Sequence, residues 1–242
     1  MNGGTLKHLR GAGAARLRTV AARDEVLLFD LDGTLTDNFT GIARSIVHAL
    51  AALGVEPPPA VELRRFVGPP LRTTFAELLG TDESGAIEEA IALYRERYSE
   101  LGWRENVVYA GIPEALASLA TSRRLFLCTA KPEIYARRIV TLFGLLEHFD
   151  GVYGSDLAGR HDDKAVLLAH LASSERLDAT RAIMIGDRSH DVRAARANGA
   201  RAIGVLWGYG SEEELANAHA IARTPGDLVS AVGEIFRTLP PG

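Results

Sequence analysis

Short apolar runs alternate along this chain with segments of helical spacing, and this alternation limits the folds that the chain can adopt. The runs are short and contain β-branched and aromatic residues, so they predict buried strands. They cover 26–29, 125–128, 182–185 and 202–206, with a weaker candidate at 149–153. Helical patterns cover 132–143, 164–171 and 190–198. Strands alternating with helices predict the α/β class, with a Rossmann-like, doubly wound parallel sheet that helices cover on both faces.

Residues 38–108 interrupt this alternation. Apolar residues recur at helical spacing from Phe39 to Leu53, and Gly54 can end that helix. Two further helical patterns cover 71–79 and 86–101, and we expect no strand in this region. The sequence therefore predicts a helical domain at 38–108, inserted after the first strand, and an α/β core made of 25–37 and 109–242. Residues 1–24 form an acid-poor, arginine-bearing extension without the apolar segment of a secretory signal.

Charge and cysteine content exclude several functional classes. Among 242 residues, 27 basic and 31 acidic side chains give a net charge of −4, which argues against a nucleic-acid polymer as partner. The one cysteine cannot form an internal disulfide. No apolar run reaches the roughly 18 to 20 residues that a membrane span requires. We therefore expect a cytoplasmic protein without a membrane partner, as a monomer or a homodimer.

Polar residues occur at four places next to predicted strands and helices. These places are the segment FDLDGTLTD at 29–37, Thr129 and its neighbours, Lys164 at a helix start, and the segment IGDRSHD at 185–191. In open parallel sheets, ligands bind beyond the carboxyl ends of the strands. Two carboxylates at the end of a buried strand need a cation or hydrogen-bond donors to offset their charge. Together the four places predict one site for a metal ion and an anionic substrate.

Carboxylates around a metal ion at such a site predict phosphoryl transfer. Because Mg²⁺ prefers oxygen ligands, we expect it among Asp30, Asp187 and the backbone carbonyl of Asp32. Asp30 would attack phosphorus and form an aspartyl-phosphate. Asp32 would protonate the leaving alcohol and then deprotonate the attacking water. We expect Asp191 to support the metal or to position Lys164.

The other site residues are expected to bind the substrate. The Thr129 hydroxyl and the Lys164 ammonium would hold the non-bridging phosphate oxygens. The turn at Gly33 and the backbone at Ala130 would direct N–H groups toward an anion.

Four further residues lie near these motifs. Lys131 is the second candidate for a phosphate-facing cation, and Arg72 is a candidate ligand for a substrate carboxylate or phosphate. We expect His190 to serve the first turn of its helix rather than to bind a metal, and Tyr209 to pack near the hinge of the inserted domain.

The motifs resemble those of the haloacid dehalogenase-like superfamily of phosphohydrolases. FDLDGTLTD is similar to the first motif of that superfamily, LCTAK to the second, Lys164 to the third and IGDRSHD to the fourth, so the resemblance spans 26–191. It implies Asp30 as nucleophile, Asp32 as acid/base, and a helical cap at 38–108 that closes over the site and selects the substrate. It also implies that Thr129 and Lys164 bind phosphate and that Asp30, Asp32 and Asp187 surround Mg²⁺. Many relatives have a proline after the third-motif lysine, whereas Ala165 follows Lys164 here.

Two segments indicate which branches of the superfamily this chain resembles most. FVGPPLR at 66–72 and GVLWGYG at 204–210 are most similar to phosphoglycolate phosphatases and to a neighbouring 5′-nucleotidase branch. We therefore expect an Mg²⁺-dependent phosphomonoester hydrolase of a small metabolite, most similar to phosphoglycolate phosphatases. A 5′-nucleotidase and a phosphomutase are alternatives on the same scaffold, and a non-catalytic phosphate-binding regulatory module is the alternative from another class. The presence of both Asp30 and Asp32 argues against that module, because binding alone needs no acid/base.

Overall fold

The computed structural model describes residues 24–157 and 160–239. The N-terminal extension expected at 1–24 lies outside these residues except for Asp24.

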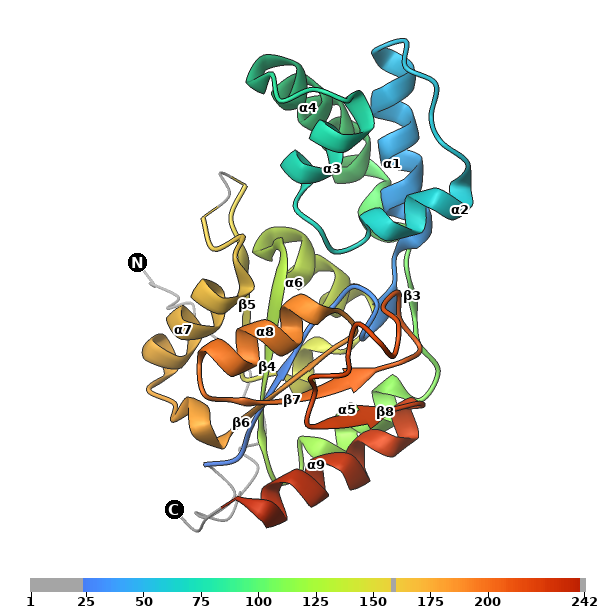
Figure 1. Ribbon diagram of the computed structural model, residues 1–242. Helices are drawn as coiled ribbons and strands as arrows, with labels where there is room; N and C mark the ends of the chain where they lie inside the picture. The colour runs from blue at the N-terminus through green and yellow to red at the C-terminus, as the bar shows by residue number, and fades with distance from the viewer. Residues whose placement is uncertain (1–23, 158–159, 240–242) are drawn as a thin grey trace, which may run out of the picture.

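A six-stranded parallel sheet forms the centre of the core (Figure 1). Its strand order is β5-β4-β1-β6-β7-β8, and every neighbouring pair is parallel. The strands are β1 (Val26–Phe29), β4 (Arg124–Pro132), β5 (Gly151–Ser155), β6 (Ala182–Gly186), β7 (Arg201–Val205) and β8 (Ala220–Ala222). This topology confirms the predicted α/β class and the doubly wound sheet. The edge strand β8 was not predicted, since it is only three residues long.

Helices cover both faces of the sheet because its strands are apolar on both sides. Leu27 and Phe29 pack with the helices of one face, whereas Val26 and Leu28 pack with those of the other. The first face carries α5 (Ile112–Leu119), α6 (Glu133–Leu142) and α9 (Leu228–Thr238), and the second carries α7 (Lys164–Glu175) and α8 (Ser189–Ala197). The buried polar side chains of this region, among them Asp30, Thr129 and Asp187, lie at or just after the carboxyl ends of β1, β4 and β6.

The inserted region forms four α-helices, which we call the cap. They are α1 (Phe39–Ala52), α2 (Ala60–Leu63), α3 (Leu71–Leu79) and α4 (Ser84–Glu100). The cap has an apolar core of its own, in which Ile46, Leu50 and Phe75 are fully buried. In Figure 1 the cap helices lie together at the top, away from the sheet. On this basis we propose that 38–108 is a separate domain.

The expectation of no strand between 38 and 108 was wrong. β3 (Val107–Val108) pairs in antiparallel fashion with β2 (Thr36–Asp37), with Thr36 opposite Val108 and Asp37 opposite Val107. The two chain segments that join the cap to the core are thus hydrogen-bonded to each other. A strand of two residues has no detectable periodicity, which is why the sequence pattern did not reveal it.

Short 3₁₀ segments complete the described part of the chain. They are Arg64–Phe66, Gly102–Arg104, Leu146–His148, Ala179–Arg181 and Pro225–Asp227.

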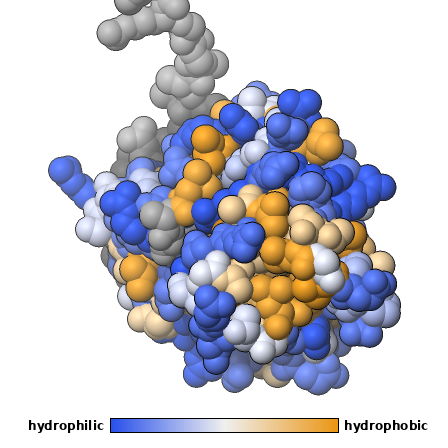
Figure 2. Space-filling model, turned by 90° about the horizontal axis from the view of Figure 1, so that it is seen from above, coloured by the Kyte–Doolittle hydropathy of each residue, from blue (hydrophilic) through white to orange (hydrophobic). Residues whose placement is uncertain are grey.

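Within the described ranges, every helix is too short or too polar to cross a bilayer. Viewed from the cap side, the molecule shows an apolar patch surrounded by hydrophilic residues (Figure 2).

Candidate active site

Asp30 lies at the carboxyl end of β1, in the centre of the sheet, and is almost fully buried. Its Oδ1 accepts a hydrogen bond of 2.8 Å from the Leu31 backbone N–H, and its Oδ2 lies 2.7 Å from the Lys164 ammonium. Burial acts to raise the pKa of Asp30, but Lys164 and a hydrogen bond from the Thr129 hydroxyl outweigh it and hold the pKa below its ordinary value. Asp30 is therefore ionised and in contact with two of the expected phosphate ligands.

Lys164 is the first residue of α7, and Asp163 caps this helix by accepting hydrogen bonds from Ala165 N–H and Val166 N–H. The Lys164 ammonium lies between two carboxylates, at 2.7 Å from Asp30 Oδ2 and 2.5 Å from Asp191 Oδ1. Burial acts to lower the pKa of Lys164, but these two carboxylates raise it above its ordinary value. A buried lysine at a helix start is unfavourable to the helix dipole. Here the negative charges of Asp30 and Asp191 compensate this unfavourable interaction.

Asp187 follows β6 and is completely buried. Its Oδ2 accepts a hydrogen bond of 2.8 Å from the Tyr209 backbone N–H, and its Oδ1 lies 3.5 Å from the Thr34 hydroxyl. Burial, together with the negative charges of Asp191 and Asp30, raises the pKa of Asp187 to about 8. Such a carboxylate needs a positive charge beside it to be ionised at neutral pH.

A divalent cation would offset the charge of three buried carboxylates here, of which Asp30 and Asp191 but not Asp187 belong to the candidate metal group. Asp30, Asp187 and Asp191 are each 5% exposed or less, and Lys164 is the one ammonium paired with this group in the described ion pairs. Ligand atoms of Asp30, His190 and Asp191 lie within 4.8 Å of one another and form the one candidate metal group found among the described residues. His190, which was expected to serve its helix only, thus lies beside the carboxylates.

Three glycines in two loops lie against Asp187. Gly33 has φ of +81°, and a Cβ there would lie 2.2 Å from Asp187 Oδ2. A Cβ at Gly208 would lie 2.3 Å from the Gly33 carbonyl oxygen, and one at Gly210 would lie 1.9 Å from the Asp187 carbonyl oxygen. The segment after β7 therefore wraps tightly around the end of β6. The glycines of GVLWGYG could be read from the sequence, but their contacts with Asp187 and Gly33 could not.

Tyr209 packs where the core joins the inserted domain, as expected from the sequence, but its contact with Asp187 was not foreseen. Besides its backbone contact with Asp187, its hydroxyl donates a hydrogen bond of 2.7 Å to Asp37 Oδ1 and accepts one of 3.1 Å from the Asn38 N–H. These partners lie at the end of β2 and the start of α1. The same residue therefore connects the buried carboxylate to the first segment leading into the cap.

Arg188, in the fourth motif, also contacts the cap. Its Nη1 donates a hydrogen bond of 2.7 Å to the Val67 carbonyl oxygen, and its Nε lies 2.9 Å from Glu214 Oε1. Glu214 accepts a further hydrogen bond of 2.8 Å from the Ser189 N–H. Sequence reasoning missed Glu214, because its position in space depends on the fold of the segment after β7.

Asp32 forms its ion pair with a different lysine from Asp30. Its Oδ2 lies 2.7 Å from the Lys131 ammonium. Burial raises the pKa of Asp32 above its ordinary value, although the Lys131 charge opposes the rise. The side chain of Asp32 is thus held by a different lysine from the one that holds Asp30.

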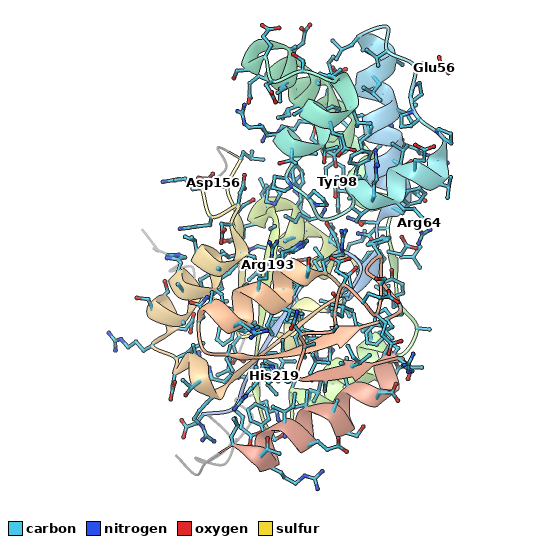
Figure 3. The ribbon with its side chains drawn as sticks, in the orientation of Figure 1. Glu56, Arg64, Tyr98, Asp156, Arg193 and His219 are labelled. Carbon is cyan, nitrogen blue, oxygen red and sulfur yellow. The ribbon has the colours of Figure 1, made fainter. Side chains whose placement is uncertain are left out.

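A cavity of about 240 Å³ lies between the cap and the core, next to Asp32. Phe66, Tyr94 and Tyr98 line it from the cap, and Ala130 and Lys131 line it from the core. Figure 3 shows Tyr98 at the lower end of the cap, facing the core.

Arg72 lies at the same cavity but is more than half exposed and pairs with Glu88 of α4. The structure therefore brings Arg72 to the cavity but not to the buried carboxylates.

Comparisons with known proteins agree with this geometry. The family model described as haloacid dehalogenase-like hydrolase matches residues 27–205. The chain belongs to this family. A 5′-nucleotidase from Pseudomonas aeruginosa is 45% identical to this hydrolase over 215 residues, which cover 88% of this chain and 96% of that protein.

Two further proteins resemble this haloacid dehalogenase-like hydrolase. The tyrosine-protein kinase PtkA from Mycobacterium tuberculosis is 42% identical over 187 residues, which cover 77% of this chain and 63% of that protein. The crystal structure of a predicted phosphatase from Clostridium acetobutylicum has a TM-score of 0.81 at 37% identity and covers 89% of this chain and 99% of its own. The chain is accordingly an enzyme of the phosphatase type.

Gly33→Ala tests the tight packing around Asp187. Its Cβ would overlap Asp187 Oδ2, so we expect phosphatase activity to fall about 100-fold through displacement of the carboxylate. Gly144→Ala is the matched control, because Gly144 has a similar φ of +69° and no atom within 4 Å of the added Cβ. The control should lose about 1–2 kcal/mol of unfolding free energy and keep its activity. Equal activity of the two variants would contradict the account.

Proposed function

We propose that this hydrolase releases phosphate from nucleoside 5′-monophosphates in an Mg²⁺-dependent reaction through an aspartyl-phosphate on Asp30. The observation that carries the proposal is the pairing of two carboxylates with two lysines at the end of β1. Asp30 contacts Lys164 beside further carboxylates, and Asp32 contacts Lys131 at the cavity under the cap. One carboxylate is thus disposed toward phosphate and metal, and the other toward the leaving group.

In the first step, an Asp30 oxygen forms a bond to phosphorus while the bond from phosphorus to the ester oxygen breaks. The departing oxygen takes a proton from Asp32. The two environments suit these roles, because Lys164 holds the pKa of Asp30 low while burial raises that of Asp32. Thr129 and Lys164 would bind the non-bridging oxygens, whose charge increases in the transition state.

In the second step, water attacks the phosphorus of the aspartyl-phosphate. Asp32, now ionised, takes a proton from that water, and the bond between phosphorus and Asp30 breaks. Inorganic phosphate leaves, and Asp30 and Asp32 return to their starting protonation states. The side chain of Asp32 lines the cavity, which is the side from which both the leaving group and the water would approach.

Asp30, Asp187 and the backbone carbonyl of Asp32 are the residues proposed to hold Mg²⁺, with Asp191 keeping Lys164 beside them. A bound cation would offset the charge of the carboxylates and of the incoming phosphate. Oxygen donors suit Mg²⁺ better than an imidazole does, so His190 is not included among its ligands. The raised pKa of Asp187 supports this assignment, since it reflects burial first and then the neighbouring negative charges of Asp191 and Asp30.

The lining of the cavity favours a nucleoside as leaving group. Phe66, Tyr94 and Tyr98 provide aromatic surface, and aromatic side chains bind flat rings by stacking and edge-to-face contacts. The relative named 5′-nucleotidase supports the same substrate class. Arg72, the candidate ligand for a phosphoglycolate carboxylate, pairs instead with Glu88.

Phosphate release over a panel of esters tests the function. Nucleoside 5′-monophosphates, 2-phosphoglycolate and sugar phosphates are each incubated with Mg²⁺ or with EDTA. We expect release from the nucleotides with Mg²⁺ only, and none from Asp30→Asn, because amide nitrogen cannot replace the attacking carboxylate oxygen. Release that persists in Asp30→Asn would overturn the mechanism, and transfer to an acceptor without phosphate release would indicate a phosphomutase.

Ile91→Phe tests the use of the cavity. Ile91 lies on α4, is buried and lines the cavity, so a larger side chain there reduces the space for a nucleoside. We expect KM for nucleoside 5′-monophosphates to rise about tenfold, which corresponds to about 1.4 kcal/mol of lost binding, with little change for any activity on 2-phosphoglycolate. Ile134→Phe is the control, because Ile134 is half exposed and lies outside this cavity. An unchanged KM in Ile91→Phe would place the nucleoside elsewhere.

A further inference from the structure

Lys131 is a buried cation that the proposed phosphate contacts leave without a function. Its side chain is 6% exposed, and its ammonium lies 2.7 Å from Asp32 Oδ2. The phosphate-binding position beside Asp30 already has an ammonium, that of Lys164. Each of the two carboxylates after β1 therefore has a lysine of its own.

An irregularity of the sheet aims Lys131 at Asp32. The register between β4 and β5 shifts between Thr129 and Pro132, so Ala130 and Lys131 have no partner residue in β5. Such bulges change the direction in which side chains point. Gly154 of β5 makes room for the bulge, because a Cβ there would lie 2.5 Å from the Lys131 carbonyl oxygen.

The cap completes the surroundings of Lys131. Its ammonium lies 5.0 Å from the centre of the Tyr98 ring, within the range of a cation–π interaction. Tyr98 is buried at the end of α4, stacks on Tyr94 at 5.3 Å and meets Tyr135 of α6 edge-on at 5.2 Å. The position of Lys131 thus depends on contact between the cap and the core.

We propose that Lys131 is the positioning residue of Asp32: it holds the carboxyl group toward the leaving-group oxygen, and Tyr98 of the cap holds Lys131. The inference rests on the proposed function, in which Asp32 donates the proton to the leaving group. It differs from phosphate binding by Lys131 in a measurable way. A positioning residue of the acid matters most for leaving groups that need a proton, whereas a phosphate ligand matters equally for all esters.

Two aryl phosphates of similar shape separate these roles. Phenolate is a poor leaving group and needs a proton, whereas 4-nitrophenolate leaves more readily without one. We expect Lys131→Met to lower kcat/KM for phenyl phosphate about 100-fold and for 4-nitrophenyl phosphate less than about tenfold. kcat/KM is the suitable quantity, because it reports on the steps up to departure of the leaving group and not on the later attack of water.

Lys164→Met is the matched control, since the same substitution at the lysine of Asp30 should lower both values of kcat/KM to a similar extent. Lys131→Arg should recover most of the activity with phenyl phosphate, because it keeps the charge. Tyr98→Leu should show the selective loss in weaker form. In Asp32→Asn, the further change Lys131→Met should add no selective loss, because residues that act as a unit are not additive. Melting temperatures of all variants identify any that fail to fold.

Equal losses for the two esters in folded Lys131→Met would overturn the inference and make Lys131 a phosphate ligand. A selective loss that Lys131→Met adds in the Asp32→Asn background would overturn it as well. Failure of the proposed function has a different signature. In that case the wild-type enzyme would release phosphate from neither ester, and positioning of Asp32 would be refuted together with its catalytic role.

Discussion

The pairing of Lys164 with Asp30 and Asp191 is the interaction on which the site depends. Parallel strands bring their carboxyl ends to one edge of the sheet, and here that edge carries three buried carboxylates. Burying like charges together is unfavourable unless cations lie beside them. Lys164 supplies one such charge from the start of α7, and its position explains why a lysine begins that helix. The charge that remains unbalanced is what makes the site suited to a metal ion and to the chemistry of phosphate.

The cap reaches this site at several separate points. β2 and β3 tie its two connections together, and Tyr209 links Asp187 to the entry of α1. Arg188 contacts the carbonyl oxygen of Val67, and Lys131 lies under the ring of Tyr98. The contacts of Tyr209, Arg188 and Lys131 each join a cap segment to a residue adjacent to the carboxylates of the site. Movement of the cap would therefore change both the shape of the cavity and the surroundings of Asp32, the proposed acid/base residue.

Sequence patterns were informative where a residue's role follows from its neighbours in the chain. The apolar runs predicted the central strands, and Asp30 with Asp32 followed from their place at the end of β1. The partner of each lysine depends on contacts between distant elements, so the sequence left Lys131 as a second phosphate cation. The bulge of β4, the strand pair β2–β3 and the contact of Glu214 with Arg188 likewise arise from tertiary packing. The sequence contains the glycines around Asp187, but it does not show that they approach Asp187 closely.

The most direct test of the central claim is to trap the enzyme during turnover. The enzyme is mixed with a nucleoside 5′-monophosphate and Mg²⁺, quenched in acid within the first turnover, digested, and its peptides are analysed by mass spectrometry. The account predicts one phosphoryl group on the peptide that contains Asp30, and none on that peptide from Asp30→Asn. Phosphate release with no phosphorylated peptide, or with the phosphoryl group on another residue, would contradict it.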